Sequence, residues 1–230
     1  MSSSSSLHVV VAIDGPSGAG KSTVAKQLAS VLGYRYVDSG TMYRAVGWVV
    51  YSSAESWDDS VAIAALLERT KIEITFLHGR SEVWVNDRQI TGDLRGEAVA
   101  QAASTVAKQA AVRQVITSQL RRLRCQADLV MEGRDIGTVV FPDATVKFYL
   151  DASLEVRAQR RFLEMQQAGQ EMPMEHVARA VATRDAQDRS RVLAPLMSAS
   201  DARVIDTTDF AIDEIVQSML LGIYQVITTG

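Results

Sequence analysis

The sequence is short of the residues that build metal and disulfide sites. It has one cysteine, Cys125, and three histidines in 230 residues. A single thiol excludes an internal disulfide and a cysteine-based zinc site. The histidines at 8, 78 and 176 lack the HxH or HxxxH spacing of a metal-binding pair. We therefore expect no structural metal, and a reducing compartment such as the cytoplasm suits the chain.

Long apolar runs and an excess of basic residues are also missing. No run approaches the ~18 apolar residues that cross a bilayer, so we expect no membrane-spanning segment. The 24 basic and 27 acidic residues give a net charge of -3, which offers no global positive field to a nucleic acid. Any anion site must then be local. Residues 1–6, a methionine followed by serines, are expected to form a disordered tail.

Five short apolar runs predict buried strands, at residues 9–13, 34–37, 128–131, 146–150 and 203–205. Helical patterns are found at 21–32, 97–124, 154–167 and 212–226. Continuous rather than alternating apolar runs are typical of strands that are buried on both faces. The order of strands and helices therefore predicts an α/β fold with a parallel sheet covered by helices.

Residues 71–90 break this order, because apolar residues alternate with polar ones on either side of His78-Gly79-Arg80. The alternation predicts a small antiparallel hairpin, with a further turn at Asn86-Asp87. Such an insert either shapes a substrate site or is a structural embellishment.

Residues 15–22 fill every fixed position of the phosphate-loop pattern GxxxxGK[ST], between a predicted strand and a predicted helix that Gly33 can end. In such a loop, backbone N–H groups and the helix N-terminus bind phosphate oxygens. Lys21, which we expect to face solvent, bridges the β- and γ-phosphates, and Ser22 holds Mg²⁺. The predicted ATP ligands are Gly15, Pro16, Ser17, Gly18, Ala19, Gly20, Lys21, Ser22 and Thr23.

A second anion site is predicted at the next strand end. Ser39, Tyr43 and Arg44 follow the strand at 34–37, whose carboxyl end meets the same edge of the sheet as the phosphate loop. A plain helix cap with a core tyrosine is the alternative. Two anion sites on one edge suit phosphoryl transfer between two substrates.

Other features narrow the class of reaction. The NKxD-like base-reading motif of Ras-type GTPases is absent from the sequence. Glu132 ends the hydrophobic strand that starts at 128, where it either holds Mg²⁺ through water or is a solvated carboxylate.

Arginines at helical spacing form a possible lid. Arg157, Arg160 and Arg161 lie on one face of the helix that Ser153 is expected to begin. They form either a solvated charged face or a mobile lid that neutralises charge when a group passes between two anions.

A further charged group lies later in the chain. Arg184, Asp188 and Arg191 are predicted to share one helical face, as surface salt bridges or as ligands of a sugar and a phosphate. The arginines at 121, 122 and 124 are interpreted as a solvated face.

Several segments together resemble the bacterial cytidylate kinases. They are IDGPSGAGKST (13–23), YVDSGTMYR (36–44), EGRDIGTVVFPDA (132–144), RDAQDRSR (184–191) and LAPL (193–196). The match runs in the same order from about Leu7 to the C-terminus, and GRDxGTVVFPDA separates this family from adenylate, thymidylate and shikimate kinases.

The resemblance implies a three-layer P-loop fold with a five-stranded parallel sheet, a small antiparallel β insert and a short helical lid. The core is expected at 7–38, 106–152 and 172–230, the nucleoside-monophosphate (NMP) arm at 39–105 with its insert at about 71–91, and the lid at 153–171. The activity implied is in-line transfer of the ATP γ-phosphoryl group to CMP or dCMP, with Mg²⁺, by a monomer.

The resemblance also implies the roles of single residues. The implied catalytic residues are Lys21, Arg134, Arg157, Arg160, Arg161 and Arg191. The implied CMP ligands are Ser39, Tyr43, Arg44, Ser104, Arg113, Arg134, Asp135, Arg184, Asp188 and Arg191. Of these, Ser104, Arg113 and Asp135 read cytosine. A carboxylate accepts from the exocyclic amine of cytosine and faces a carbonyl in uracil, so UMP is disfavoured.

Two alternatives remain open at this stage. The chain is a P-loop kinase for another small acceptor, such as UMP, AMP or shikimate, or it is a switch that binds ATP without transfer. The arginine-rich segments favour a kinase, because a switch has no acceptor phosphate to neutralise. A base is not required, since the acceptor phosphate is already anionic at neutral pH, with a second pKa near ~6.

Overall fold

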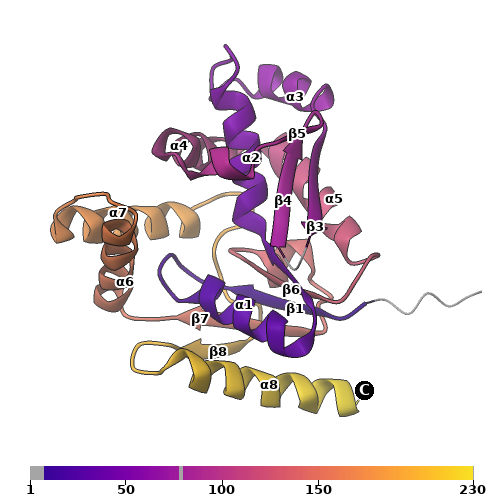
Figure 1. The fold of residues 1–230 in the computed structure, drawn as a ribbon, viewed down its shortest axis with the longest axis vertical. Helices are drawn as coiled ribbons and strands as arrows, with labels where there is room; N and C mark the ends of the chain where they lie inside the picture. The colour runs from indigo at the N-terminus through magenta and orange to yellow at the C-terminus, as the bar shows by residue number, and fades with distance from the viewer. Residues whose placement is uncertain (1–7, 78–79, 230) are drawn as a thin grey trace, which may run out of the picture. The chain divides into compact units, whose positions relative to one another are not determined.

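The computed structural model describes residues 8–77 and 80–229 (Figure 1). Its residues cluster into two compact units. The core unit contains Val9–Tyr34 and the chain from Leu129 onward, and the arm unit contains His8 and Arg35–Asp128. The predicted tail at 1–6 and the turn residues His78 and Gly79 lie outside the described residues.

The five predicted strands form one parallel sheet in the order β2-β6-β1-β7-β8. Their bounds are Val10–Asp14 (β1), Arg35–Asp38 (β2), Leu129–Gly133 (β6), Val146–Asp151 (β7) and Arg203–Asp206 (β8). Each lies within two residues of its expected position. All of β1 is buried, and Asp14 at its end is in register with Gly133 and Tyr149. The central strand therefore delivers the phosphate loop to the middle of the sheet edge.

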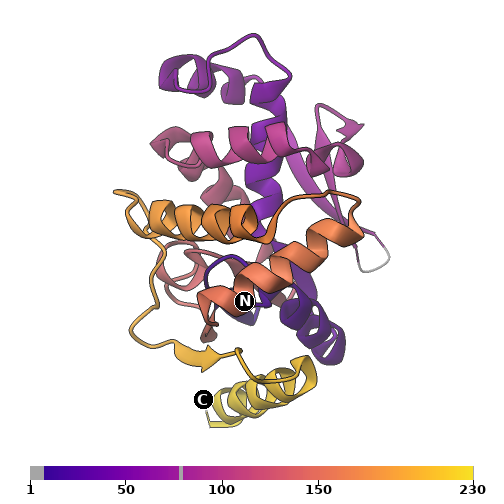
Figure 2. The ribbon, with the colours of Figure 1, turned by 90° about the vertical axis from the view of Figure 1, so that its left-hand side faces the viewer.

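The helices of the core unit are α1 (Lys21–Leu32), α6 (Leu154–Gln167), α7 (Met174–Arg189) and α8 (Ile212–Thr229). All except α7 follow the predicted helical ranges closely. Ser153 accepts a hydrogen bond from the N–H of Val156 and so caps α6, as expected. Gly33 ends α1 with a φ of 71°. Helices α6 and α7, drawn in orange, pack against each other in Figure 2.

The arm unit holds four helices and a small sheet among its described residues. The helices are α2 (Ser39–Tyr51), α3 (Ser60–Glu68), α4 (Glu97–Val106) and α5 (Ala110–Leu123), with a 3₁₀ turn at Thr91–Arg95. The sheet contains β3 (Ile72–Leu77), β4 (Arg80–Val85) and β5 (Arg88–Gln89). Helices α2 and α4 touch at Gly47, where a Cβ atom would lie 2.7 Å from the Ala103 nitrogen. No larger residue fits at that crossing.

The predicted insert is confirmed as an antiparallel sheet, because β3 pairs with β4 and β4 pairs with β5. Asn86 and Asp87 form the second turn, with φ values of 46° and 66°. The Asn86 side chain also accepts a hydrogen bond of 2.9 Å from the N–H of Lys71. The turn residues predicted from the sequence thus connect β4 to β5.

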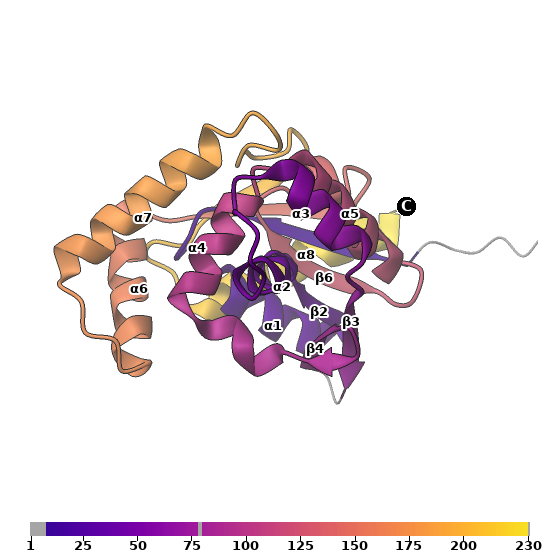
Figure 3. The same ribbon diagram turned by 90° about the horizontal axis from the view of Figure 1, so that it is seen from above.

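The single helix expected at 97–124 is wrong, because the chain forms α4 and α5 with a break at 107–109 (Figure 3). Two side chains stabilise this break. Gln109 donates to the Trp57 carbonyl at 2.9 Å, and Arg113 donates to the Ala107 carbonyl at 3.1 Å. Helix α5 belongs to the arm unit. The bounds expected for the core, the NMP arm and the lid stay predictions.

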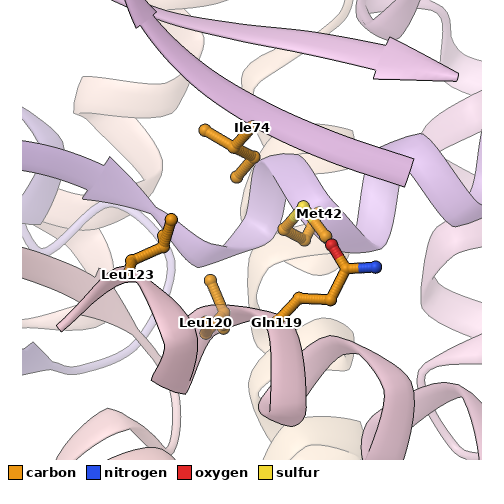
Figure 4. Close-up of a pocket in the computed structure, with 5 residues that line it drawn as sticks. All are labelled: Met42, Ile74, Gln119, Leu120 and Leu123. Atoms are coloured by element: carbon orange, nitrogen blue, oxygen red, sulfur yellow. The ribbon is translucent and has the colours of Figure 1, made fainter. Parts of the chain in front are cut away.

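A small cavity in the arm unit records how β3 packs on α2 and α5 (Figure 4). Its volume is about 20 Å³, and it is lined by Met42, Ile74, Gln119, Leu120 and Leu123. This volume accepts one water molecule and is far below the ~300 Å³ of a small ligand site. The cavity is a gap in packing. None of the described helices is long and apolar enough to cross a membrane.

Candidate active site

The phosphate loop connects β1 to α1 through glycines that no other residue can replace. Gly15 and Gly18 have φ values of 149° and 78°, which side chains rarely adopt. A Cβ atom on Gly15 would lie 2.0 Å from the Leu150 carbonyl oxygen, and one on Gly18 would lie 2.6 Å from the Arg157 oxygen. The loop therefore packs directly against β7 and α6.

Four successive carbonyl oxygens of this loop accept hydrogen bonds from side chains. The pairs are Pro16 with Lys21 Nζ (2.6 Å), Ser17 with Arg157 Nη1 (3.2 Å), Gly18 with Arg160 Nη1 (3.4 Å) and Ala19 with Thr207 Oγ1 (3.2 Å). With its carbonyls held, the loop meets an anion with its backbone N–H groups and with the start of α1. The donors come from three different parts of the core unit.

Lys21 is buried, with 6% of its surface exposed, so the expectation that it faces solvent is wrong. Burial, followed by the positive charge of Arg134, lowers the pKa of its ammonium group from 10.5 to about 7. The carboxylates of Glu132 and Asp14 act in the opposite direction. A buried ammonium group that is short of negative charge is well suited to bind phosphate.

Asp188 lies between two predicted phosphate ligands. It is 1% exposed, and its Oδ2 atom accepts a hydrogen bond of 2.9 Å from Arg134 Nε. Its Oδ1 atom accepts from Arg191 Nη2. Arg191 Nε is buried without a hydrogen-bond partner among the described residues. One carboxylate thus holds two guanidinium groups, which leaves this cluster with a net positive charge.

One detail of the predicted geometry is wrong. Arg191 lies beyond the end of α7 at Arg189, so it does not share a helical face with Arg184. It reaches Asp188 from the turn that follows the helix.

The three predicted lid arginines have different surroundings. Arg157 is buried, donates to the Ala152 carbonyl at 2.9 Å and forms an ion pair with Asp185. Arg160 donates to the carbonyl and hydroxyl oxygens of Thr207 at 2.6 and 3.0 Å. Arg161 is exposed and pairs with a neighbouring carboxylate on its own helix. Arg157 and Arg160 therefore form hydrogen bonds with the phosphate loop and with residues packed beside it. The catalytic role of all three arginines stays a prediction.

The arm unit holds the predicted ligand Arg44 through Asp38. The Asp38 carboxylate caps α2 and accepts from Gly40 N–H (2.8 Å), Thr41 Oγ1 (2.9 Å) and Arg44 Nη2 (2.6 Å). Burial raises the pKa of this carboxyl group, but the Arg44 charge and the hydrogen bonds outweigh burial and hold the pKa below its usual value. Asp38 stays ionised and fixes the guanidinium group.

The other predicted ligands of the arm unit lie on three helices. The Arg113 guanidinium group lies over the Tyr43 ring, 5.5 Å from its centre, and joins α5 to α2. Ser39 is buried at the start of α2, and Ser104 is half-buried on α4. The structure therefore brings Tyr43 and Arg113 together, and their assignment as CMP ligands stays a prediction.

Sequence reasoning missed a second carboxylate. Asp14, at the end of β1, is 3% exposed and accepts hydrogen bonds from the N–H groups of Ile136 (2.8 Å) and Gly137 (2.7 Å). Burial raises the pKa of its carboxyl group to about 6, although these hydrogen bonds lower it. Asp185 and Thr207 were missed as well. An acid directly after a predicted strand is the signal that could have found Asp14, and the same signal marks Asp38.

The core unit contains candidate ligands for a divalent cation that binds together with substrate phosphates. The described residues contain no cluster of three or more His, Cys, Asp or Glu side chains able to hold a metal ion. Ser22 is exposed in the first turn of α1, and Glu132 is buried at the end of β6, close enough to raise the pKa of Lys21. Mg²⁺ commonly binds through one or two protein oxygens, water and phosphate oxygens, and these residues match that pattern.

Comparison with known proteins gives one family. The family described as cytidylate kinase matches residues 11–225. A cytidylate kinase of Caldicellulosiruptor bescii is 42% identical over 217 residues, which are 94% of this chain and 96% of that protein. One of Geobacter sulfurreducens is 41% identical over 219 residues, covering 95% and 94%.

A further relative is longer than this chain. A bifunctional pantoate ligase/cytidylate kinase of Trichormus variabilis is 45% identical over 220 residues. The alignment covers 94% of this chain and 41% of that protein, so the chain spans about two fifths of the relative's length.

Among solved structures, an uncharacterized protein from Eubacterium ventriosum aligns with a TM-score of 0.51 at 11% identity, covering 94% of this chain and 98% of that one. Shikimate kinase from Acinetobacter baumannii aligns with a TM-score of 0.47 at 18% identity, covering 95% and 94%. At these identities the first likeness speaks for the fold alone.

Proposed function

Because the chain belongs to the cytidylate kinase family, we infer that it transfers the γ-phosphoryl group of ATP to CMP and dCMP. One observation carries this inference from the site itself. The cluster of Arg134, Asp188 and Arg191 lies near enough to the phosphate-loop Lys21 for Arg134 to lower its pKa. A second positive site beside a phosphate loop suits an acceptor phosphate, which a simple nucleotide switch lacks.

The donor is proposed to bind at the phosphate loop. Backbone N–H groups of residues 15–20 and the start of α1 hold its phosphates, and Lys21 bridges the β- and γ-phosphates. When bound, Mg²⁺ supplies charge neutralisation at these phosphates. Ser22, with Glu132 acting through water, is the proposed protein contribution to that ion.

The proposed acceptor ligands are the residues that the family resemblance implies. Those proposed for the CMP phosphate are Ser39, Tyr43, Arg44, Arg134 and Arg191. The sugar is bound by Arg184 and Asp188, and cytosine is read by Ser104, Arg113 and Asp135. Asp38 supports this arrangement, because it holds the Arg44 guanidinium group.

Catalysis is proposed to depend on positioning and charge neutralisation. The acceptor phosphate is anionic at neutral pH and attacks in line, so no general base is required. Arg160 and Arg157 keep the loop carbonyls in place, and with Arg161 they form the proposed lid that closes on the transferring group. We also propose that the enzyme is a monomer in the cytoplasm. Its proposed partners are ATP and CMP or dCMP, without a nucleic acid or a membrane.

An acceptor panel tests the proposed function. We expect ADP production from ATP and Mg²⁺ with CMP and dCMP, weak production with UMP, and none with AMP or shikimate. Asp135→Ala should lower the ratio of kcat/KM for CMP to that for UMP by on the order of tenfold to a hundredfold, because the amine of cytosine loses its acceptor. The exposed Asp143 lies in the same segment, so Asp143→Ala is the matched control. ATP binding without acceptor-dependent turnover would leave a phosphate-loop protein that is not this kinase.

The low pKa of Lys21 predicts proton uptake on nucleotide binding. In the free protein its ammonium group titrates at about 7, so at pH 8 it is mostly neutral. Phosphates favour the charged form, and we expect about one proton to be taken up per ATP bound at pH 8, and little uptake at pH 6. Calorimetry in two buffers of different ionisation enthalpy measures this number. Lys21→Arg keeps its charge at pH 8, so persistent uptake in that variant would assign the proton to another group.

A further inference from the structure

The segment that follows β6 is held in place through the backbone carbonyl group of Asp135. Residues Ile136–Val140 form a π-helix. The π-helix is rare in proteins, and where it occurs it often lies at a functional site. The Asp135 carbonyl accepts from the N–H groups of Val139 (2.9 Å) and Val140 (3.1 Å). These bonds set the position of the Asp135 backbone relative to the turn behind it.

The opposite side of the same backbone is held by Asp14. Its two carboxylate oxygens accept from the consecutive N–H groups of Ile136 and Gly137, which directly follow Asp135. Asp14 also directly precedes Gly15, where the phosphate loop begins. One buried carboxylate therefore connects the start of the phosphate loop to the segment that carries the proposed base reader.

Lys147 closes the segment from the other end. Its Nζ atom donates to the Pro142 carbonyl at 2.6 Å and to the Asp201 carboxylate at 2.8 Å. A Cβ atom on Gly137 would lie 3.1 Å from Lys147 Cδ and 3.4 Å from Asp14 Oδ2. Both ends of the segment are attached, and a side chain at Gly137 would force Lys147 to shift.

A buried carboxylate at position 14 lowers the free energy of unfolding, because its charge is removed from water. Burial disfavours the charged form of Asp14, and the neighbouring Asp135 charge adds to this effect. Two N–H groups and the nearby Lys21 oppose it. A serine or asparagine could satisfy one of these N–H groups at a smaller cost of burial, whereas a carboxylate accepts from both and so fixes the orientation of two successive peptides.

We infer that Asp14 is a positioning residue for acceptor selectivity, which acts by holding the backbone of residues 135–137 so that the Asp135 carboxylate keeps its place against the acceptor base. This inference rests on the proposed function, because Asp135 as the reader of cytosine is itself proposed there. It adds a residue outside the proposed ligand set, and it assigns the effect to the backbone rather than to direct contact with a nucleotide.

The test compares Asp14→Asn with Gly137→Ala. The asparagine keeps the shape of the side chain but accepts from only one N–H group, while its loss of charge removes a cost of burial, so the variant is expected to fold. The alanine disturbs the same backbone by crowding Lys147 and Asp14 with its methyl group. Asp213→Asn is the matched control, because Asp213 is an exposed carboxylate with one hydrogen bond, from Gln27.

In both test variants we expect the kcat/KM ratio of CMP over UMP to fall about tenfold, mainly through a higher KM for CMP. Affinity for a non-hydrolysable ATP analogue should stay close to wild type, and the control should match wild type throughout. Hydrogen exchange at the Ile136 and Gly137 amides should be faster in Asp14→Asn, a readout that does not depend on activity.

The outcomes separate the two proposals. A wild-type enzyme without CMP-dependent turnover refutes the proposed function and this inference with it. A wild type that prefers CMP, with variants that keep this preference or lose turnover with CMP and UMP equally, refutes the positioning role alone. If Asp14→Asn does not fold, the selectivity of Gly137→Ala decides.

Discussion

Lys21→Ala is expected to lower kcat for CMP phosphorylation by on the order of 10³-fold, with no loss of thermal stability. The ammonium group is the buried cation of the phosphate loop, and nothing else in its first helical turn carries positive charge. Because a charge that meets the transferring group stabilises the transition state more than the bound substrate, the loss should appear in kcat and not only in KM for ATP.

Stability should behave differently because the folded protein holds this charge at a cost. The folded pKa of Lys21 is about 7, below its ordinary value of 10.5. At and below pH 7 the full cost of a buried ammonium group applies, and this cost falls progressively as the pH rises from 7 to 10.5, where the folded protein has lost the proton and the unfolded chain still holds it. Removing the side chain should therefore raise the free energy of unfolding most at low pH, which thermal melts at pH 6 and pH 9 can compare.

The matched control is Lys26→Ala, since Lys26 is exposed on the same helix. Single-turnover kinetics with saturating ATP isolates the chemical step. A Lys21→Ala enzyme that folds and keeps turnover within a few fold of wild type would remove Lys21 from the mechanism.

Asp188→Asn is expected to lower kcat/KM for CMP by on the order of 10²-fold, about 3 kcal/mol. The wild-type carboxylate accepts from Arg134 and Arg191 at the same time. An asparagine offers one acceptor oxygen and turns its NH₂ group toward the second guanidinium group, so one arginine loses its position and its counter-charge.

Comparison of CMP with dCMP distinguishes two roles of Asp188. If it acts by holding the arginines, both substrates lose the same factor, since both carry the same phosphate. If it contacts the 2′-hydroxyl group of the sugar, CMP loses more than dCMP. The control is Asp209→Asn, at an exposed carboxylate in the loop before α8. Unchanged kinetics with both substrates would contradict either role.

The sequence predicts best what depends on neighbours along the chain. The strand ends, the phosphate loop and the cap at Ser153 follow from patterns of a few residues, and each was found within two residues of its expected place. The break between α4 and α5 was missed, because it depends on Gln109 reaching the Trp57 carbonyl, 52 residues away. No local pattern contains that contact.

The same reason limits the prediction of the site. Asp14 is visible as an acid at a strand end, but its partners are N–H groups 122 and 123 residues later. The arginines at 157 and 160 were found by their spacing, while their attachment to loop carbonyls depends on how α6 lies on the loop. The sequence therefore identifies which residues carry charge, but it does not show which of them form hydrogen bonds within the folded protein.

The way the phosphate loop is assembled has a consequence for synthesis on the ribosome. Among the described strands β1 is made first, yet its two neighbours in the sheet, β6 and β7, begin at Leu129 and Val146. The last of the four loop carbonyls, that of Ala19, accepts its hydrogen bond from Thr207, which is made 188 residues later. A nascent chain thus carries the complete nucleotide motif before the contacts that shape it can form. The binding site is completed only after β8 has been made, so a protein truncated before β8 should keep the signature and lack the site.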